Sequence, residues 1–365
     1  MNLSRRTFVG VVLAAGARGA VGRADTDDRI EWHTIKPHDL RGRGWAETSP
    51  EFGRLPGWAQ GRVTSGVWNN GRCAAGQYLD FTTDSPELRV TWALGSGELG
   101  MWHMTEAGKS GLDLYARDQM GRLRWYAVAG PGGQQTRDRV LARPPTGLNH
   151  FRLYMPLYNE LTELSIGTRS NARWEVARHD DAKRRPIVFY GSSIMQGCSA
   201  SRPGMAFAAI LGRRLGVETI NLGFSGSAKM EPVLADLLGE IEASAYAIDA
   251  MPNMNPNQVR ERAVPFVERL RAKRGETPIL LVEGRAFTNA WAEPGRSRYA
   301  AERRAALQDA YDALVKSGIG GLHYLTSDRL LGDDSEAAID GSHPTDLGMM
   351  RYADAYEPVL RKMLG

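Results

Sequence analysis

The second half of the sequence alternates apolar runs with amphipathic stretches, and this alternation constrains the fold more than any other feature. Uniformly apolar runs predict buried strands at 187–190, 217–222, 245–248, 278–282 and 322–325. Helical periodicity predicts helices at 205–215, 232–241, 256–273, 299–316 and about 346–363. Strands that are apolar on both faces and alternate with helices indicate an α/β fold, in which helices cover both faces of a parallel sheet.

The first half has a different pattern, with short strand-like segments separated by turn residues. These segments lie at 77–82, 88–92, 112–115, 123–128 and 150–154. Such spacing favours a β-sandwich of the jelly-roll type. The charged segment 178–185 (RHDDAKRR) has the composition of a linker. We therefore predict a β-sandwich domain over 27–180 and an α/β domain over 185–365.

Residues 1–24 have the order of features expected of an export signal. An Arg pair, Arg5 and Arg6, stands in a context that resembles the twin-arginine motif, and an apolar run at 8–17 follows it. Gly22 and Ala24 supply small residues for a cleavage site after residue 24. A chance Arg pair is the alternative, but the order of the features favours export to the periplasm or beyond. No other apolar stretch is long enough to span a bilayer, so we expect a soluble mature chain.

The charge balance gives no reason to expect a nucleic-acid partner. The formal net charge is +4, but four of the 46 basic residues lie in 1–24, and the 42 that remain equal the 42 acidic residues. The seven histidines include no close pair at ligand spacing, so neither a metal nor another cofactor is predicted. An oxidising compartment would permit a bridge between Cys73 and Cys198, and the sequence leaves that pairing open.

Candidate catalytic residues follow the predicted strands of the second half. Ser193 comes directly after the first strand, and a glycine-containing loop at 221–226 follows the second. Asn253 follows the third, and His343 lies in the loop that opens the last helix. The carboxyl ends of parallel strands share one edge of the sheet, where ligands bind, so we expect these segments to meet there.

The spacing of Asp340 and His343 suits acid–base chemistry. A carboxylate three residues before a histidine bends back to bond the imidazole, which fixes the tautomer that accepts a serine proton. The alternatives are structural, with Ser193 as a helix N-cap and Asp340–His343 as a loop-closing bond. Their occurrence together favours a triad of Ser193, His343 and Asp340.

The four segments, in this order, resemble the four sequence blocks of the SGNH (GDSL-type) hydrolases. The resemblance implies a flavodoxin-like parallel sheet flanked by helices and a serine nucleophile at Ser193. It also implies an oxyanion hole formed by the backbone N–H groups of Ser193 and Gly226 and the side-chain amide of Asn253. Ser192 stands where the family usually has aspartate, which puts a supporting hydrogen bond in doubt.

A subset of this superfamily carries an N-terminal β-sandwich marked by Gly-x-Asp-Leu-Tyr, found here at 111–115, and Ala-Ser-Arg-Pro-Gly, found here at 200–204. We expect Asp113 and Tyr115 to tie the sandwich to the second domain. Arg202 either braces its loop or meets a substrate, and we favour bracing. Glu283, at the end of a predicted strand, is a candidate for a supporting role near the site.

The leading hypothesis is an exported serine esterase for short acyl esters, chiefly acetyl, on a glycan or a small molecule. Eight of the nine tryptophans precede residue 180, which is compatible with sugar binding but also with core packing. The alternatives are an acyltransferase that uses the same acyl-enzyme and a catalytically inactive carbohydrate-binding protein. The sequence fixes neither the natural substrate nor the oligomeric state.

Overall fold

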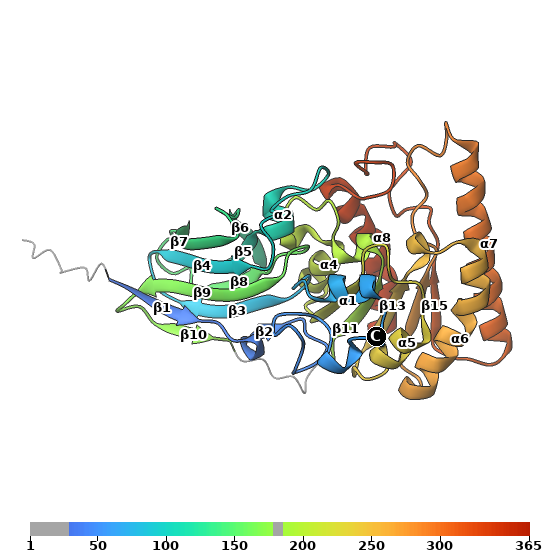
Figure 1. The fold of residues 1–365 in the computed structure, drawn as a ribbon, viewed down its shortest axis with the longest axis horizontal. Coiled ribbons are helices and arrows are strands. Elements are labelled where there is room, and N and C mark those ends of the chain that lie inside the picture. The colour runs from blue at the N-terminus through green and yellow to red at the C-terminus, as the bar shows by residue number, and fades with distance from the viewer. Residues whose placement is uncertain (1–28, 178–184) are drawn as a thin grey trace, which may run out of the picture.

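The computed structural model describes residues 29–177 and 185–365. It contains two antiparallel sheets in the first half and one parallel sheet in the second (Figure 1). The predicted export signal lies outside the described residues, as does segment 178–184 of the predicted linker. Among the described residues, no helix is both long and apolar enough to cross a bilayer.

The first half forms two antiparallel sheets. The four-stranded sheet has the order β1 (Ile30–Thr34), β9 (Leu161–Arg169), β4 (Leu88–Leu94), β7 (Gln135–Ala142). The other has the order β10 (Trp174–Val176), β3 (Tyr78–Thr83), β8 (His150–Tyr154), β5 (Leu112–Arg117), β6 (Leu123–Ala129), with β2 (Leu40–Arg41) paired to β3. Short helical segments connect them: η1 (Pro37–Asp39), η2 (Gly57–Ala59), α1 (Ser65–Gly71) and α2 (Glu106–Ser110).

The core between these sheets confirms the predicted sandwich. Phe81 and Leu114 from one sheet and Trp92 and Ile166 from the other belong to one buried cluster. The side chains of a strand alternate between its two faces, so each sheet contributes one apolar face to this core. The five predicted strands are all present, whereas β1, β2, β7, β9 and β10 were not predicted.

The second half forms the predicted parallel sheet. Its order is β12 (Thr219–Gly223), β11 (Ile187–Gly191), β13 (Ala245–Asp249), β14 (Ile279–Val282), β15 (Leu322–Leu325), and all neighbours run parallel. Numbered within this domain, the order is 2-1-3-4-5, the flavodoxin-like arrangement. In such a sheet the order reverses between β11 and β13, which places a ligand crevice beyond the carboxyl ends of these two strands.

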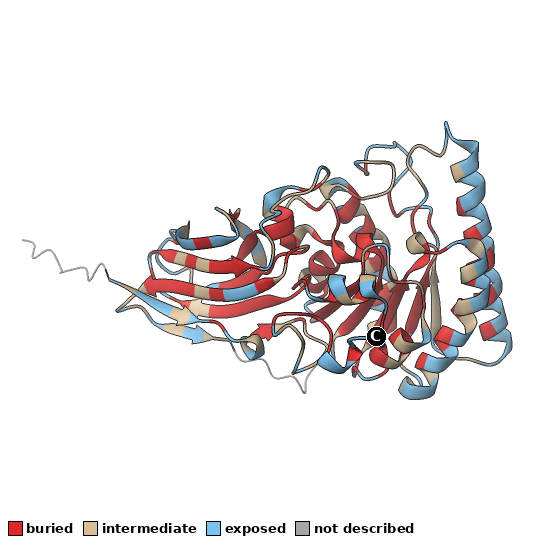
Figure 2. Cartoon of the chain, in the orientation of Figure 1, coloured by how far each residue is buried: buried red, intermediate tan, exposed pale blue. Residues whose placement is uncertain are grey.

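Helices cover both faces of the parallel sheet. They are α3 (Ser193–Gln196), η3 (Pro203–Met205), α4 (Phe207–Leu215), α5 (Pro232–Leu238), η4 (Met251–Asn253), α6 (Pro256–Arg274), α7 (Pro294–Lys316) and α8 (Asp346–Leu364). Phe189 packs in one cluster with α4 and α8, whereas Val188 and Tyr190 pack with α5, α6 and α7 in another. Both faces of β11 are therefore buried, and most of the parallel strands have the colour of buried residues in Figure 2.

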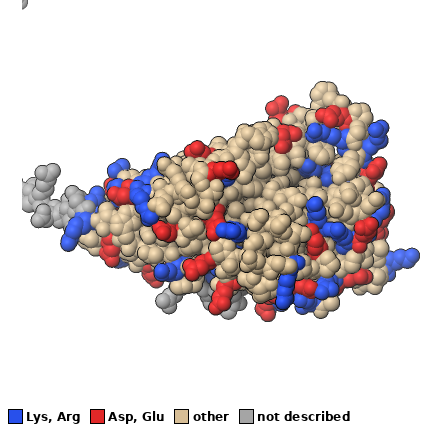
Figure 3. Space-filling view, viewed as in Figure 1, with Lys and Arg blue, Asp and Glu red and all other residues tan. Residues whose placement is uncertain are grey.

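The two halves are in close contact. Leu55 and Val67, from the first half, belong to the hydrophobic cluster of the parallel sheet. Arg54 is fully buried, and its Nη1 donates to the carbonyl oxygens of Asn221 at 2.9 Å and Gly223 at 2.8 Å. Since β12 is an edge strand, Arg54 satisfies carbonyl groups that would otherwise lack partners in the sheet. The surface shown in Figure 3 intersperses both signs of charge.

Candidate active site

Ser193 is the first residue of α3, at the carboxyl end of β11. The preceding residue, Ser192, caps this helix, because its Oγ accepts from the N–H of Ile194 at 3.3 Å. Ser193 is therefore not the N-cap, which removes the simplest structural role for its hydroxyl. A Cβ at Gly191 would lie 2.5 Å from the carbonyl oxygen of Asp249, so a glycine is required where the chain turns out of the sheet.

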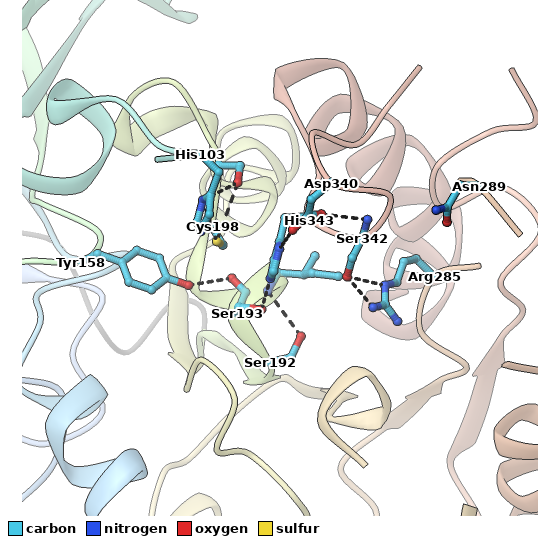
Figure 4. A network of polar contacts seen from close by, with 12 residues as sticks. His103, Tyr158, Ser192, Ser193, Cys198, Arg285, Asn289, Asp340, Ser342 and His343 are labelled. Carbon is cyan, nitrogen blue, oxygen red and sulfur yellow. Dashed lines mark hydrogen bonds and ion pairs between the residues drawn. The ribbon is translucent and has the colours of Figure 1, made fainter. Parts of the chain in front are cut away.

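The structure brings Ser193, His343 and Asp340 into one hydrogen-bonded chain (Figure 4). Ser193 Oγ lies 2.9 Å from Nε2 of His343, and His343 Nδ1 lies 2.7 Å from Oδ2 of Asp340. An ionised carboxylate only accepts, so Nδ1 carries a proton, and Nε2 of the neutral ring accepts from the serine hydroxyl. This is the tautomer that a general base requires.

The loop that holds Asp340 is organised by its own backbone. Oδ1 of Asp340 accepts from the N–H groups of Ser342 at 2.9 Å and His343 at 2.7 Å. Burial raises the pKa of Asp340, but these bonds and the charge of His343 outweigh it, so the pKa is lowered overall. Asp340 therefore stays ionised beside the imidazole at neutral pH.

The imidazole of His343 is a stronger base than usual. Burial lowers its pKa, but contacts with Cys198 and Asp340 exceed this effect and raise the pKa to about 9. Cys198 lies five residues after Ser193 in the sequence, and its thiol is buried. It forms no disulfide with Cys73 in the structure, where both cysteines are free.

Arg285 supports the same loop from the far side of Ser342. Its Nε donates to Ser342 Oγ at 3.1 Å, and Nη2 also donates to this oxygen. Arg285 is buried, and burial lowers its pKa. Glu283, the supporting residue suggested by the sequence, instead accepts from the hydroxyl of Tyr324 and from the N–H of Ser327.

The candidate oxyanion-hole residues lie on adjacent loops. The Asn253 amide nitrogen lies 3.2 Å from the carbonyl oxygens of both Phe224 and Ala228, which ties η4 to the loop that contains Gly226. Gly226 has φ +66, and within the described part of the chain its N–H has no acceptor. The amide of Asn253 carries two hydrogens, so a substrate oxygen would compete with one of its present acceptors.

Two residues from the first half reach the site, and sequence reasoning missed both. The hydroxyl of Tyr158 donates to the Ser193 carbonyl oxygen at 3.1 Å. The His103 ring stacks on His343 with centroids 5.5 Å apart and planes 12° from parallel. His103 Nδ1 also lies 3.1 Å from Oγ of Ser199. In Figure 4 Tyr158 lies to the left of Ser193 and Arg285 to the right.

His103 lies next to an exposed aromatic ring. Burial and the charge of His343 lower the pKa of His103, so its ring stays neutral against the triad. The neighbouring Trp102 is 78% exposed and contacts the His103 ring edge-on, with centroids 4.6 Å apart. The first half therefore contributes to the surroundings of His343.

The Gly-x-Asp-Leu-Tyr segment has the structural position expected from the sequence. Arg202 Nη1 donates to Asp113 Oδ2 at 2.8 Å and to the Tyr115 hydroxyl at 2.6 Å. Asp113 Oδ2 also accepts from the N–H of Gly204, and Trp125 Nε1 donates to Oδ1. A Cβ at Gly204 would lie 2.8 Å from Asp113 Oδ2, which explains the glycine. These contacts join the sandwich to the loop before α4.

Among the described ranges 29–177 and 185–365, no group of three or more His, Cys, Asp or Glu side chains is arranged to hold a metal ion. A serine hydroxyl hydrogen-bonded to an imidazole is an arrangement that can form a covalent bond to an acyl carbon.

Several solved structures share this architecture. A protein described as a GDSL-like lipase from Bacteroides ovatus superposes with a TM-score of 0.86 at 33% identity, covering 92% of this chain and 98% of that one. A salicylyl-acyltransferase from a tetracycline biosynthetic pathway has a TM-score of 0.70 at 18% identity, covering 91% and 97%. A family two carbohydrate esterase from Cellvibrio japonicus has a TM-score of 0.58 at 13% identity, covering 92% and 99%.

A search of curated proteins finds no match. Two family models do match the sequence, and they agree with the structural comparisons. A family model for the N-terminus of SGNH-hydrolase-type esterases matches residues 30–174, and the model of the GDSL-like lipase/acylhydrolase family matches residues 184–361. With these matches and the relative at 33% identity, the chain belongs to the GDSL-like lipase/acylhydrolase family.

Proposed function

We propose that this chain is an exported serine esterase that hydrolyses short acyl esters, chiefly acetyl esters, of carbohydrates or small molecules. The observation that carries the proposal is the bond chain from Ser193 Oγ through His343 to Asp340, at 2.9 and 2.7 Å. Ser193 is the nucleophile, His343 the general base and Asp340 the residue that orients the base.

In the proposed reaction, Ser193 Oγ attacks the ester carbonyl carbon while its proton passes to Nε2 of His343. Asp340 stabilises the imidazolium that forms. His343 then gives this proton to the departing alcohol, which leaves an acyl group on Ser193. Water, deprotonated by His343, attacks the acyl carbon of the acyl-enzyme. The bond from this carbon to Ser193 Oγ breaks, the proton on His343 returns to Oγ, and the carboxylic acid is released. The raised pKa of His343 favours the imidazolium in both steps.

The oxyanion of each tetrahedral intermediate is assigned to donors at the carboxyl edge of the sheet. The N–H of Ser193 is at the first position of α3, where a helix leaves its N–H groups without intrahelical acceptors. The N–H of Gly226 and the amide of Asn253 complete the proposed set. Loss of one such donor typically costs about 100-fold or more in rate.

The carbohydrate part of the proposal rests on surface chemistry and on the predicted export, and not on the fold. The family two carbohydrate esterase and an acetyl xylan esterase from Butyrivibrio proteoclasticus (TM-score 0.52, 12% identity) have the same fold, which at such identities says nothing of the substrate. Trp102, exposed and next to His103, is suited to pack against a sugar ring at the mouth of the site. Export, from the predicted signal at 1–24, would bring the enzyme to external glycans.

An acyltransferase is the second candidate. The salicylyl-acyltransferase shares the fold over 91% of this chain. Transfer would use the same acyl-enzyme and replace water by an acceptor alcohol. Product analysis separates the two, because a transferase forms a new ester when the acceptor is added, and an esterase continues to release the free acid.

The test is acetate release from acetylated oligosaccharides and xylan, beside p-nitrophenyl esters of increasing chain length. Acetate release by the parent, lost in Ser193→Ala and kept in the control Ser317→Ala at the end of α7, would support the proposal. Release that survives in Ser193→Ala would refute the assignment of the nucleophile. Serine-dependent cleavage of the small esters alone would remove the carbohydrate part.

A further inference from the structure

Two buried arginines lie close to the loops of the candidate active site. Arg285 follows β14, and Arg303 lies in α7. A buried cation costs free energy unless a negative charge lies near it. Neither guanidinium forms a direct ion pair with a carboxylate in the described part of the chain, so the balancing charge must act on them without such a contact.

The balancing charge is that of Asp249, the last residue of β13, which is fully buried. Its Oδ2 accepts from the hydroxyl of Tyr356 on α8 at 2.8 Å. Burial raises the pKa of Asp249 to about 6, although this hydroxyl and the charges of both arginines oppose the effect. Asp249 is therefore largely ionised at neutral pH. The buried charge cluster thus consists of Asp249, Arg285 and Arg303.

Each arginine of the buried charge cluster holds one loop of the candidate site. Nε of Arg285 donates to Ser342 Oγ at 3.1 Å, in the loop of the proposed general base. Nη1 of Arg303 donates to the carbonyl oxygen of Met251 at 2.9 Å. Met251 begins η4, which ends with Asn253, the proposed oxyanion donor. The two guanidinium groups therefore connect the loop of the base and the loop of the amide to one buried region.

The backbone of Asp249 reaches the third loop. Its carbonyl oxygen accepts from the N–H of Ser192 at 3.2 Å, directly before Ser193. The same oxygen lies against Gly191, where a Cβ would come within 2.5 Å of it. One residue thus carries both the carboxylate of the cluster and a contact to the turn of the proposed nucleophile. The cluster consequently touches all three loops, although none of its members lies in the bond chain from Ser193 to Asp340.

Four buried polar atoms in and beside the cluster make no hydrogen bond to the described residues. They are Oδ1 of Asp249, Nη1 of Arg285, Nε of Arg303 and the hydroxyl of Tyr352. The charges of all three cluster members act on Tyr352, so its hydroxyl lies near them. Two N–H donors, a carboxylate oxygen and a hydroxyl match the lone pairs and hydrogens of a water, and a buried water typically makes about three such bonds. A shared water would couple the carboxylate to both guanidinium groups without a direct ion pair.

We propose that the buried charge cluster positions the nucleophile, the oxyanion amide and the general base relative to one another, with Arg285 acting on His343 through Ser342. The proposal rests on the function proposed above, and it concerns positioning rather than contact with substrate. A purely structural ion pair offers the contrast. Asp80 and Arg152, on β3 and β8 of the sandwich, form a buried pair at 2.7 and 2.6 Å and bond to none of the three loops in the described structure.

The kinetic test measures kcat/KM for p-nitrophenyl acetate in variants that circular dichroism shows to be folded. Arg285→Met and Asp249→Asn should each lower kcat/KM by about 10-fold or more, because small displacements of reacting groups are costly. The matched control Asp80→Asn weakens a buried pair of the same kind and should keep kcat/KM close to that of the parent. Arg285→Lys retains the charge and is a milder change, so it should keep more activity than Arg285→Met.

A double variant tests the route through Ser342. If Arg285 acts through this side chain, Ser342→Ala should lower kcat/KM, and adding it to Arg285→Met should cost nothing further. Multiplied losses in the double variant would overturn this route. Parental kcat/KM in Arg285→Met and Asp249→Asn, or an equal loss in Asp80→Asn, would overturn the positioning role.

Histidine NMR provides a readout that does not need turnover. The proton on His343 Nδ1, which is bonded to Asp340 at 2.7 Å, should resonate far downfield. We expect this resonance to shift in Arg285→Met and to stay in place in Asp80→Asn. An unmoved resonance in Arg285→Met would overturn the proposal even in a chain that hydrolyses no ester. A parent that lacks esterase activity but shows the expected shift would refute the proposed function alone.

Discussion

Removing the carboxylate of Asp113 should destabilise the protein by about 3–5 kcal/mol, because it breaks a buried ion pair from one side. Asp113 is fully buried and accepts from Arg202 Nη1 and the N–H of Gly204, both at 2.8 Å, and from Trp125 at 3.1 Å. In Asp113→Ala the guanidinium keeps only the Tyr115 hydroxyl as a side-chain hydrogen-bond partner among the described residues. Because the Arg202 side chain is 20% exposed, water can hydrogen-bond to the guanidinium in the variant and offset part of the lost stability. We therefore expect a destabilisation at the lower end of this range.

A double-mutant cycle isolates this bond. Asp113→Ala, Arg202→Met and the double variant are unfolded in urea while tryptophan fluorescence is followed, and the coupling free energy should be about 2 kcal/mol or more. The matched control is the pair Arg137–Glu163, which lies at 3.1 Å with side chains 53% and 58% exposed. Its coupling should stay below about 0.5 kcal/mol. A coupling for Asp113 and Arg202 no larger than that of the control would refute the assignment of this contact as the tie between the two halves.

Three further predictions concern catalysis. Burial lowers the pKa of His343, but Cys198 and its other partners raise it to about 9, and only the neutral ring accepts a proton. The kcat/KM for p-nitrophenyl acetate should therefore rise with pH up to an inflection near 9. Cys198→Ala should move this inflection to lower pH. An inflection that does not move would exclude the Cys198 thiol as a cause of the raised pKa of His343. Loss of the stacked ring in His103→Ala should lower kcat about 10-fold, with His103→Phe retaining most activity and the exposed His38→Ala serving as control. Asn253→Ala should lower kcat by about 100-fold, whereas an unchanged rate would remove this amide from the oxyanion hole.

The parallel sheet could be predicted because its strands are apolar on both faces, a pattern that few other structures require. The missed strands of the sandwich lack this signal. β7 (QTRDRVLA) is an edge strand with several exposed charged residues, and β9 contains an interior glycine. Helix α7 begins at Pro294, before the predicted residue 299, because its first turn is polar and shows no apolar periodicity.

The hydrogen-bonded chain of Ser193, His343 and Asp340 could be predicted in part because Asp340 and His343 are close in sequence. The residues that were missed, His103, Tyr158 and Arg285, come from segments far from Ser193 or His343 in the sequence and carry no local pattern. His103 lies in a turn of the first half, Tyr158 in the loop after β8, and Arg285 in the segment after β14. Tertiary packing brings each of them to the site. Only the pairing of the two family motifs suggested that the sandwich packs near the catalytic residues.

The central claim, that Ser193 is a nucleophile activated by His343, is tested most directly by covalent labelling. The chain is incubated with a fluorophosphonate, which reacts with activated serines, and the modified peptide is located by mass spectrometry while hydrolysis of p-nitrophenyl acetate is followed. We expect one label, on Ser193, that forms in step with the loss of activity and is greatly slowed in His343→Ala. A label on another serine, or full activity in a chain labelled at Ser193, would contradict the account.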